Sequence, residues 1–370
     1  MHSGDWYTIH NIQEVDTPAL IVYPERVREN IRLLKSMVPD ASRLRPHMKT
    51  NKSAEVAKMM LEEGITKFKC ATIAEAEMLA AAGAHDILLA YQPVGPKASR
   101  LLELVNRFPK TEFSCLVDNH QSAVELSAVF EKVHLKINVF LDLNVGMNRT
   151  GIAPENALDL FLYTLHLNGL TPVGLHAYDG HLRDSDFDVR KSKCDEGFCK
   201  VETLRDQLIQ QTGKKPKIIA GGTPTFPIHA QREHVECSPG TFIYWDKGYQ
   251  SILTEQPFVF AALIITRIIS KPNEETICND LGHKAIASEN PLDKRVTFLN
   301  ASNLEPIGHS EEHMVLHVAK GNTWKVGDVL YGVPYHICPT VALHERVNVV
   351  IDHQVQTTWT TAARNRTITV

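Results

Sequence analysis

The stretch KFKCATIAEAEMLAAAGAHDILLAY, residues 67–91, decides the fold class. An apolar run at 67–72 precedes an amphipathic stretch at 73–83, and a second apolar run follows at 86–91. Gly83 closes the amphipathic stretch, and glycine is a common C-terminal signal of a helix. Two strands joined by a helix form a βαβ unit with parallel strands. The stretch therefore predicts an α/β fold.

The same alternation continues along the chain up to about residue 245. Eight β-branched or apolar runs are separated by helical patterns, at 19–23, 42–49, 67–72, 86–91, 112–118, 135–143, 171–178 and 215–222. Eight βα units in a row predict a (β/α)8 TIM-type barrel. A doubly wound open sheet is the alternative, and the near-even spacing of the eight repeats favours closure into a barrel.

Beyond about residue 250 the pattern changes to strands joined by Gly, Pro and Asn turns, as in FVFAALIITRIISK (258–271) and RVNVVID (346–352). This texture predicts a separate, mainly antiparallel β domain. We expect the barrel to span residues 17–248. The β domain is expected to span residues 249–370, together with about residues 1–16.

Composition limits the class of function. The 370 residues are 43% hydrophobic and 22% charged, which is typical of a soluble globular protein, and the net charge of −4 argues against a nucleic-acid partner. No apolar run reaches the roughly 18 residues of a membrane span, and MHSGDWYTIH has no apolar core of a secretory signal. Seven cysteines without a framework spacing indicate reduced thiols in the cytoplasm. Cys194 and Cys199 could form a site, although two cysteines on a helix surface is the favoured interpretation.

Polar residues follow several of the predicted barrel strands, at the end where such barrels carry their active sites. They are Lys49, Arg149, Tyr178, His181 and the turn Gly221, Gly222 and Thr223. A Gly-Gly-Thr turn can bind phosphate on backbone N–H groups. Gly240 and Thr241 supply a second small-residue turn. A strand-end lysine together with a phosphate turn indicates pyridoxal 5′-phosphate (PLP) held as a Schiff base on Lys49.

The lysine must be a neutral amine when it attacks the aldehyde. Nearby positive charges favour that neutral form. Arg45, His47 and Lys52 surround Lys49 in the sequence, so we expect them to supply this charge. The alternative is an ordinary surface lysine.

Six segments resemble one enzyme group, in that group's order: TPALIVY, RPHMKTNKS, VGMNRTG, YDGH, GGTPT and YHICPT. The chain resembles the fold-type III, alanine racemase-like PLP enzymes over nearly its whole length. It is most similar to the branch of D-threonine aldolases and eukaryotic-type D-serine dehydratases. RPH-x-KT is the most specific of the six segments.

The resemblance implies a role for each candidate residue. Lys49 is the PLP lysine, and Arg149 and Tyr178 lie near the cofactor ring or the substrate. The expected phosphate contacts are Gly221, Gly222, Thr223, Gly240 and Thr241. A homodimer, with the β domain of one chain facing the barrel of the other, is also implied.

His336 and Cys338 form an H-x-C pair in the predicted β domain. On an extended strand these two side chains would face the same side, and an imidazole with a thiolate suits zinc. On the sequence alone such a pair is more often accidental, but the resemblance implies a divalent metal site here. Zinc is expected, with manganese or magnesium as alternatives. Water, substrate or His181 would complete the coordination.

The expected substrate is therefore a D-β-hydroxy amino acid. In dehydration, Lys49 is the natural base for the α-proton, whereas a retro-aldol cleavage needs a base near the hydroxyl, and His181 is the candidate. Cys338, in place of an aspartate, resembles the dehydratases, so conversion of D-serine to pyruvate and ammonia is the first expectation and aldol cleavage the second. A racemase would not need the metal. A non-catalytic PLP carrier would resemble the barrel alone.

Overall fold

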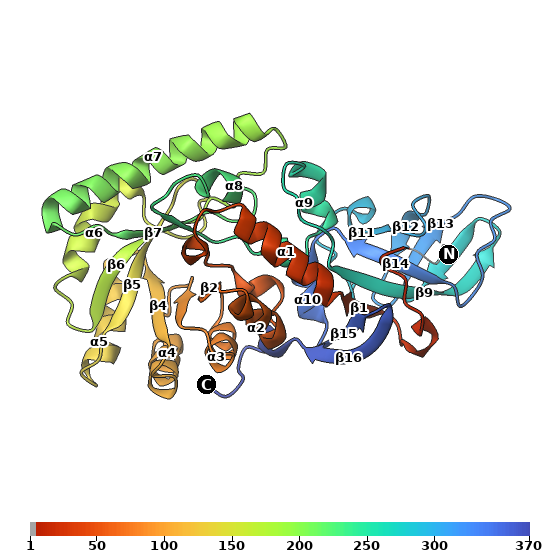
Figure 1. The fold of residues 1–370 in the computed structure, drawn as a ribbon, viewed down its shortest axis with the longest axis horizontal. Coiled ribbons are helices and arrows are strands. Elements are labelled where there is room, and N and C mark those ends of the chain that lie inside the picture. Colours follow the sequence, from red (N-terminus) through yellow and green to blue (C-terminus); the bar gives the residue numbers. More distant parts are fainter. Residues whose placement is uncertain (1–4) are drawn as a thin grey trace. The chain divides into compact units, whose positions relative to one another are not determined.

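The computed structural model describes residues 5–370, which form two compact units (Figure 1). The barrel unit comprises residues 34–49, 54–240 and 365–370. The β unit comprises residues 5–33, 50–53 and 241–364. Residues 1–4 of the segment expected in the β domain lie outside the described part of the chain.

The barrel unit contains a seven-stranded parallel sheet with helices between successive strands. Its strands, in sheet order, are β2 (Lys67–Cys70), β3 (Asp86–Leu89), β4 (Glu112–Val117), β5 (Ile137–Leu143), β6 (Leu170–Ala177), β7 (Lys217–Ala220) and β8 (Val235–Cys237). Its helices are α2 (Ala54–Glu62), α3 (Ile73–Ala81), α4 (Pro96–Arg107), α5 (His120–Glu131), α6 (Ala157–Thr164), α7 (Phe187–Thr212) and α8 (Phe226–His229).

The segment 44–47 joins the two edges of this sheet. Leu44 makes a parallel bridge to Cys237 of β8, and His47 makes one to Lys69 of β2. The segment therefore occupies the place of a first strand between β8 and β2. The predicted (β/α)8 barrel is confirmed in this form.

The strand order differs from the prediction at both ends of the barrel. The apolar run at 19–23 forms β1 (Ala19–Val22), which pairs antiparallel with β9 (Ala262–Asn273) in the β unit. The final barrel strand is β8, whose three residues VEC are too few to show a pattern. The Gly221–Thr223 turn consequently follows the seventh strand of the ring, and Ser238–Gly240 follows the eighth.

The β unit is built on a nine-stranded, mainly antiparallel sheet, as predicted. Besides β1 and β9 it holds β10 (Thr276–Asn279), β11 (Val296–Phe298), β12 (Glu305–His309), β13 (Met314–His317), β14 (Val329–Pro334), β15 (Arg346–Ile351) and β16 (Gln354–Thr360). Helices α9 (Lys247–Ile252) and α10 (Ile337–Leu343) belong to it, and α1 (Pro24–Ser36) begins in it. The expected boundaries at residues 17 and 249 thus differ from the observed division at residues 34 and 241, because β1 pairs with β9 and β15.

Local sequence signals explain why α3 begins where it does within residues 67–91. Thr72 caps α3 by accepting a hydrogen bond from the Glu75 N–H at 3.1 Å, and the Glu75 carboxylate accepts one from the Ala71 N–H at 2.6 Å. This reciprocal arrangement satisfies donors that a helix start leaves unpaired. Inward-facing apolar residues then fill the barrel, among them Leu88, Leu116, Phe140 and Ile219.

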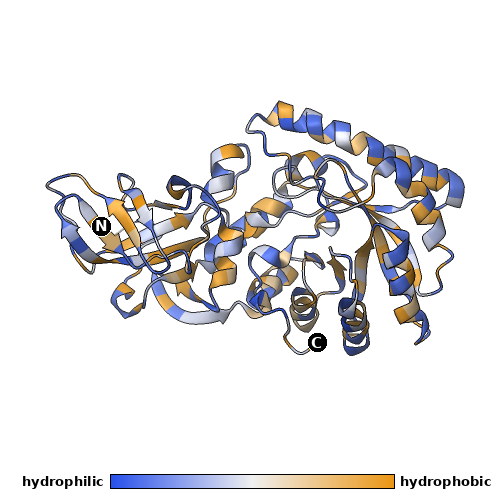
Figure 2. Cartoon of the chain, turned by 180° about the vertical axis from the view of Figure 1, so that it is seen from behind, coloured by the Kyte–Doolittle hydropathy of each residue, from blue (hydrophilic) through white to orange (hydrophobic). Residues whose placement is uncertain are grey.

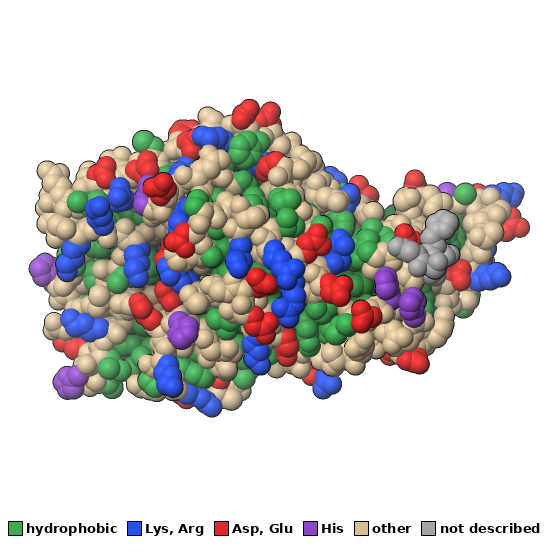
Figure 3. Space-filling view, in the orientation of Figure 1, with side chains coloured by type: hydrophobic (Ala, Val, Ile, Leu, Met, Phe, Trp, Pro, Cys, Tyr) green, Lys and Arg blue, Asp and Glu red, His purple; other side chains and the backbone are tan. Residues whose placement is uncertain are grey.

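The surface carries charged side chains of both signs, as the composition suggests. Figure 2 shows helices that carry both hydrophobic and hydrophilic residues, and Figure 3 shows acidic and basic side chains interspersed over the face in view. Among residues 5–370, none of the helices combines the length and apolar character required to cross a bilayer.

Candidate active site

Three cationic side chains of the barrel unit surround the ring of Tyr178, which directly follows β6. The Lys49 Nζ lies 5.6 Å from the ring centroid, the Lys69 Nζ 5.3 Å and the Arg149 guanidinium carbon 5.3 Å. Each of them comes from a different part of the chain: the segment after residue 47, strand β2 and the loop after β5. Positive charge gathered in this way favours an anionic ligand. Lys49, Arg149 and Tyr178, all predicted from the sequence, are thus brought together.

Two glycines leave room for the Tyr178 ring. A Cβ atom built on Gly222 would lie 2.9 Å from the ring, and one built on Gly180 would lie 2.1 Å from the hydroxyl oxygen. Such contacts are too short for real side chains, so these positions hold the backbone close to the ring because they lack a Cβ. The Gly221–Thr223 turn is therefore in contact with Tyr178.

The backbone donors of the expected phosphate turns have partners within the barrel unit. The Gly221 N–H donates to the Ala177 carbonyl at 3.0 Å, and the Gly222 N–H donates to the Thr225 hydroxyl at 3.3 Å. The Gly240 N–H donates to the Thr223 hydroxyl at 3.1 Å, which ties the two small-residue turns together. Gly221 has a φ of +78°, so its contribution is the turn itself. Thr241 lies beyond the observed division, in the β unit.

Lys69 is a residue that sequence reasoning missed. Its side chain is only 2% exposed. Burial, followed by the positive charge of Lys49, lowers the pKa of Lys69 to about 7. The available signal was a lysine within the short barrel strand KFKC, since such a residue must point either outward to solvent or inward to a site.

A buried carboxylate–imidazole pair lies on the neighbouring strands. The Asp142 Oδ1 of β5 is 2.7 Å from the His176 Nδ1 of β6, and both side chains are at most 5% exposed. Burial raises the pKa of Asp142, but hydrogen bonding and charge from His176 more than offset this and lower it overall. Burial, and then the charge of Lys69, lowers the pKa of His176. A neutral imidazole therefore faces the carboxylate.

These features fit PLP, which is a planar ring bearing a phosphate and a phenolic oxygen. The cations around Tyr178 match its negative charges, and the glycines allow the backbone to approach it. Two buried polar atoms of the barrel unit, His176 Nε2 and Ser238 Oγ, have no hydrogen-bond partner among residues 5–370. Unpaired buried atoms are costly, so a ligand that pairs them is expected.

His181 lies three residues beyond Tyr178 in the barrel unit. Its exposed side chain lines a cleft of about 570 Å³ together with Asn144, Gly146 and Lys193. A Cβ on Gly146 would lie 2.8 Å from the His181 Nε2, so the imidazole packs against the backbone of the loop that follows β5. The structure thus places His181 against the loop after β5, and its expected place beside a substrate hydroxyl stays a prediction.

The prediction that Arg45 supplies positive charge to Lys49 was wrong. Arg45 is 1% exposed, and its guanidinium forms ion pairs with Asp86 at 2.6 Å and with Glu236 at 2.7 Å. The two carboxylates compensate this charge at the start of β3 and in β8, so Arg45 serves the barrel framework. Lys69 is the basic side chain whose charge interacts with that of Lys49.

His336 and Cys338 adjoin one another in the β unit, but not on a strand as predicted. His336 caps the N-terminus of α10, and Cys338 lies in its first turn. The Cys338 Sγ is 3.2 Å from the Thr50 hydroxyl and 3.7 Å from that of Thr241. The two potential ligands therefore lie at the start of α10, two residues after β14 ends.

The surroundings of His336 fit a metal ligand. Its Nδ1 lies 2.5 Å from Glu289 Oε1, which leaves Nε2 for an ion, and metal-binding imidazoles commonly donate their other N–H to a carboxylate. Burial lowers the pKa of His336, but Cys338, Glu289 and Asp246 raise it to about 9. His336 thus lies next to the Cys338 side chain, and both groups can bind a cation in place of a proton.

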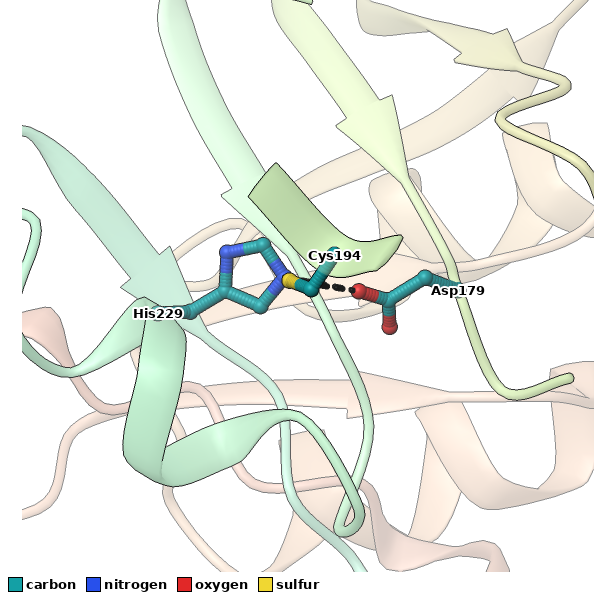
Figure 4. Close-up of side chains that lie close together, drawn as sticks. All are labelled: Asp179, Cys194 and His229. Atoms are coloured by element: carbon teal, nitrogen blue, oxygen red, sulfur yellow. Dashed lines mark hydrogen bonds and ion pairs between the residues drawn. The ribbon is translucent and has the colours of Figure 1, made fainter. Parts of the chain in front are cut away.

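A second group of potential metal ligands is buried in the barrel unit (Figure 4). Asp179, Cys194 and His229 offer ligand atoms that all lie within 4.8 Å of one another, so the group could hold a metal ion. The expectation that Cys194 lies on a helix surface was wrong, because it is 2% exposed on the inward side of α7. Cys199, on the same helix, is exposed.

Comparison with known proteins agrees with both units. Residues 22–247 match the family "Alanine racemase, N-terminal domain", and residues 261–350 match the "Putative serine dehydratase domain". The chain is 28% identical to a D-threonine aldolase from Arthrobacter sp, over 95% of this chain and 94% of that protein. It is also 28% identical to a 3-hydroxy-D-aspartate aldolase from Paracoccus denitrificans (strain Pd 1222), over 95% and 93%.

Among solved structures, that of a D-threonine aldolase from Filomicrobium marinum superposes with a TM-score of 0.86. That match covers 95% of this chain and 96% of the other, at 24% identity, and it supports the fold. The first family model covers more than half of the chain, and the second covers the segment expected to carry the metal pair. The chain therefore belongs to the alanine racemase N-terminal domain family, in the branch of PLP-dependent lyases that also carries a serine dehydratase domain.

Proposed function

We propose that this lyase uses PLP and a divalent metal to act on D-β-hydroxy amino acids, and that it dehydrates D-serine to pyruvate and ammonia. The observation that carries the proposal is the convergence of Lys49, Lys69 and Arg149 on Tyr178, next to the Gly222 turn. A lysine amine, a group of cations and a glycine cradle in one place suit a phosphorylated aldehyde.

On this proposal Lys49 holds the cofactor, and the turns that contain Gly222, Thr223, Gly240 and Thr241 border its phosphate. Bound PLP supplies an electron sink for charge that develops at Cα of the substrate. Lys49 then takes the α-proton at its Nζ, and Arg149 balances negative charge near the ring. His176, held by Asp142, offers its Nε2 as a hydrogen-bond acceptor.

His336 and Cys338 would hold the metal, and Glu289 would orient His336 through its Nδ1. Zinc suits an imidazole and a thiolate best, and manganese or magnesium remain alternatives. A bound divalent cation supplies Lewis acidity to a substrate hydroxyl. The Cys338 thiolate, and the match of this segment to a serine dehydratase domain, support dehydration.

A retro-aldol cleavage to glycine and an aldehyde is the second candidate. The observation that favours it is the 28% identity to two aldolases over almost the whole chain. On this alternative a base removes the hydroxyl proton, and His181 is the proposed residue. We further propose a cytoplasmic homodimer.

Product analysis separates the two reactions. Purified protein with PLP and ZnCl₂ is incubated with D-serine, D-threonine or D-3-hydroxyaspartate, with and without chelator. Pyruvate and ammonia from D-serine support the proposal, whereas glycine with acetaldehyde from D-threonine supports the alternative. Absence of turnover of all three amino acids at any metal loading, in protein with a full complement of PLP, would overturn the proposed substrate class.

A further inference from the structure

The group Asp179, Cys194 and His229 could be a metal site or a hydrogen-bond network, and the direction of its hydrogen bonds distinguishes the two. The Asp179 Oδ2 is 2.8 Å from the His229 Nε2. The Cys194 Sγ lies 3.5 Å from the Asp179 Oδ2 and 3.4 Å from the His229 Nε2. Figure 4 shows the thiol beside the imidazole and the carboxylate.

Arg232 fixes the proton on His229. Its Nη1 lies 2.5 Å from the His229 Nδ1, and a guanidinium can only donate, so Nδ1 accepts. The ring proton of a neutral imidazole then sits on Nε2 and is donated to Asp179. Because Nδ1 accepts from Arg232, Nε2 could bind a metal only if the ring became an imidazolate, and burial raises the pKa of the Cys194 thiol to about 12. The group therefore forms a hydrogen-bond network.

The second oxygen of Asp179 leads to the Gly221–Thr223 turn. Asp179 Oδ1 accepts from the Thr225 hydroxyl at 2.6 Å, and the Thr225 oxygen accepts from the Gly222 N–H at 3.3 Å. Thr225 is fully buried, so its hydroxyl has few alternatives. A Cβ on Gly221 would lie 2.6 Å from the His229 ring, so the same network packs against the back of the turn.

Charge along the network is compensated. Arg232 also donates to Asp195, which faces solvent. One continuous path therefore runs from the surface ion pair through His229 and Asp179 to Thr225 and the Gly222 N–H. The ionised Asp179 carboxylate accepts a hydrogen bond at each of its two oxygens, which an uncharged side chain of the same shape could not do without reversing a donor.

We propose that Asp179, oriented by His229 and Arg232, is a positioning residue that holds the Gly221–Thr223 turn in the shape that receives the phosphate of PLP. This inference rests on the proposed function, because it takes this turn as the phosphate site. Asp179 does not touch the phosphate, and it acts through the Thr225 hydroxyl.

The test compares Asp179→Asn with Cys194→Ala, with Cys199→Ala and with the unchanged protein. Asparagine keeps the size of the side chain but places an NH₂ group opposite a donor. Affinities for PLP and for pyridoxal, which lacks the phosphate, are measured by titration of the cofactor-free protein. We expect Asp179→Asn to weaken PLP binding about tenfold, as loss of one charge-assisted hydrogen bond would. Pyridoxal affinity should stay within twofold of the unchanged protein, and Cys199→Ala, at an exposed position of the same helix, should bind both as before.

Each other outcome has a definite meaning. Equal loss of PLP and pyridoxal affinity in Asp179→Asn, or no loss of either, would overturn the positioning role. Zinc that is bound by the unchanged protein and lost in both Asp179→Asn and Cys194→Ala would show a metal site instead. Failure of the unchanged protein to bind PLP would refute the proposed function itself, which separates the two failures. Should Asp179→Asn not fold, Thr225→Val removes the hydroxyl that connects Asp179 to Gly222, and it should give the same selective loss of PLP affinity.

Discussion

The His176 Nδ1 lies 2.7 Å from the Asp142 Oδ1, while Nε2 of the same buried ring has no hydrogen-bond partner among residues 5–370. One side of the imidazole is therefore fixed by the barrel, and the other is left for a ligand. Because Asp142 accepts from Nδ1–H, Nε2 carries the lone pair. The arrangement presents an acceptor to the barrel interior at the level of Tyr178, two residues further along the chain.

Asp142→Asn should destabilise the protein at neutral pH by about 1–3 kcal/mol, because the buried His176 N–H loses a charged acceptor. The folded-state pKa of Asp142 is lowered from 3.8. The stabilisation that Asp142 contributes to the folded protein is therefore fully present above pH 3.8, and it is lost as the pH falls through the lowered pKa of the folded state. Urea unfolding of the variant and the unchanged protein between pH 7 and pH 3 measures this. A difference that stays constant over that range would contradict the assignment, and Asp206→Asn, at an exposed position, is the control.

Lys69→Met should stabilise the cofactor-free protein at pH 7. The pKa of Lys69 falls from 10.5 in the unfolded chain to about 7 in the folded one. The unfolded chain thus takes up a proton between these values while the folded chain does not, so lowering the pH from 10.5 to 7 destabilises the unchanged protein, by up to about 5 kcal/mol. The variant has no amine at this position, so its free energy of unfolding lacks this pH dependence. The difference in stability between the variant and the unchanged protein should therefore shrink toward pH 10. Chemical unfolding across pH 7–10 measures it, with the exposed Lys58→Met as control. An advantage that did not change with pH would contradict a buried amine with a lowered pKa.

Gly222→Ala should weaken PLP binding about tenfold while leaving the protein folded. The new Cβ would lie 2.9 Å from the Tyr178 ring, so the ring must move away from the turn. Gly308→Ala is the matched control, because a Cβ there meets Val315 at 3.5 Å, which is ordinary contact. Cofactor titration and circular dichroism of both variants decide the matter. Unchanged PLP affinity in a folded Gly222→Ala protein would argue against a role of this turn in the cofactor site.

Cys338→Ala should remove most of the bound metal and leave PLP binding intact. One protein ligand, His336, cannot hold a divalent ion well. The residues proposed to hold the cofactor are on the barrel unit, except for Thr241, and so should be unaffected. Metal analysis and cofactor absorbance after dialysis give the two readouts, with Cys199→Ala as a control for an exposed thiol. Full metal content together with full turnover in Cys338→Ala would mean that the H-x-C pair is accidental.

Much of the fold was determined by the sequence alone, because its signals are local. The alternation of short apolar runs and amphipathic stretches comes from residues that must bury one face, and it predicted both the parallel barrel and the antiparallel β unit. The run ALIV at 19–22 has the same local pattern as a barrel strand. Only pairing with β9 and β15, which are distant in sequence, decided that it belongs to the β unit.

Some residues of the candidate site could likewise be predicted from the sequence, and others depended on the tertiary structure. Lys49, Arg149 and Tyr178 could be predicted because strand ends and distinctive segments mark them in the sequence. Three features could not be predicted from the sequence: the role of Lys69, the ion pairs of Arg45, and the path from Arg232 to Gly222. Each depends on which side chains distant segments bring within hydrogen-bonding or Coulombic range. Sequence fixes which way a strand residue can point. Tertiary structure decides what it meets there, and burial among those neighbours sets the charge that it carries.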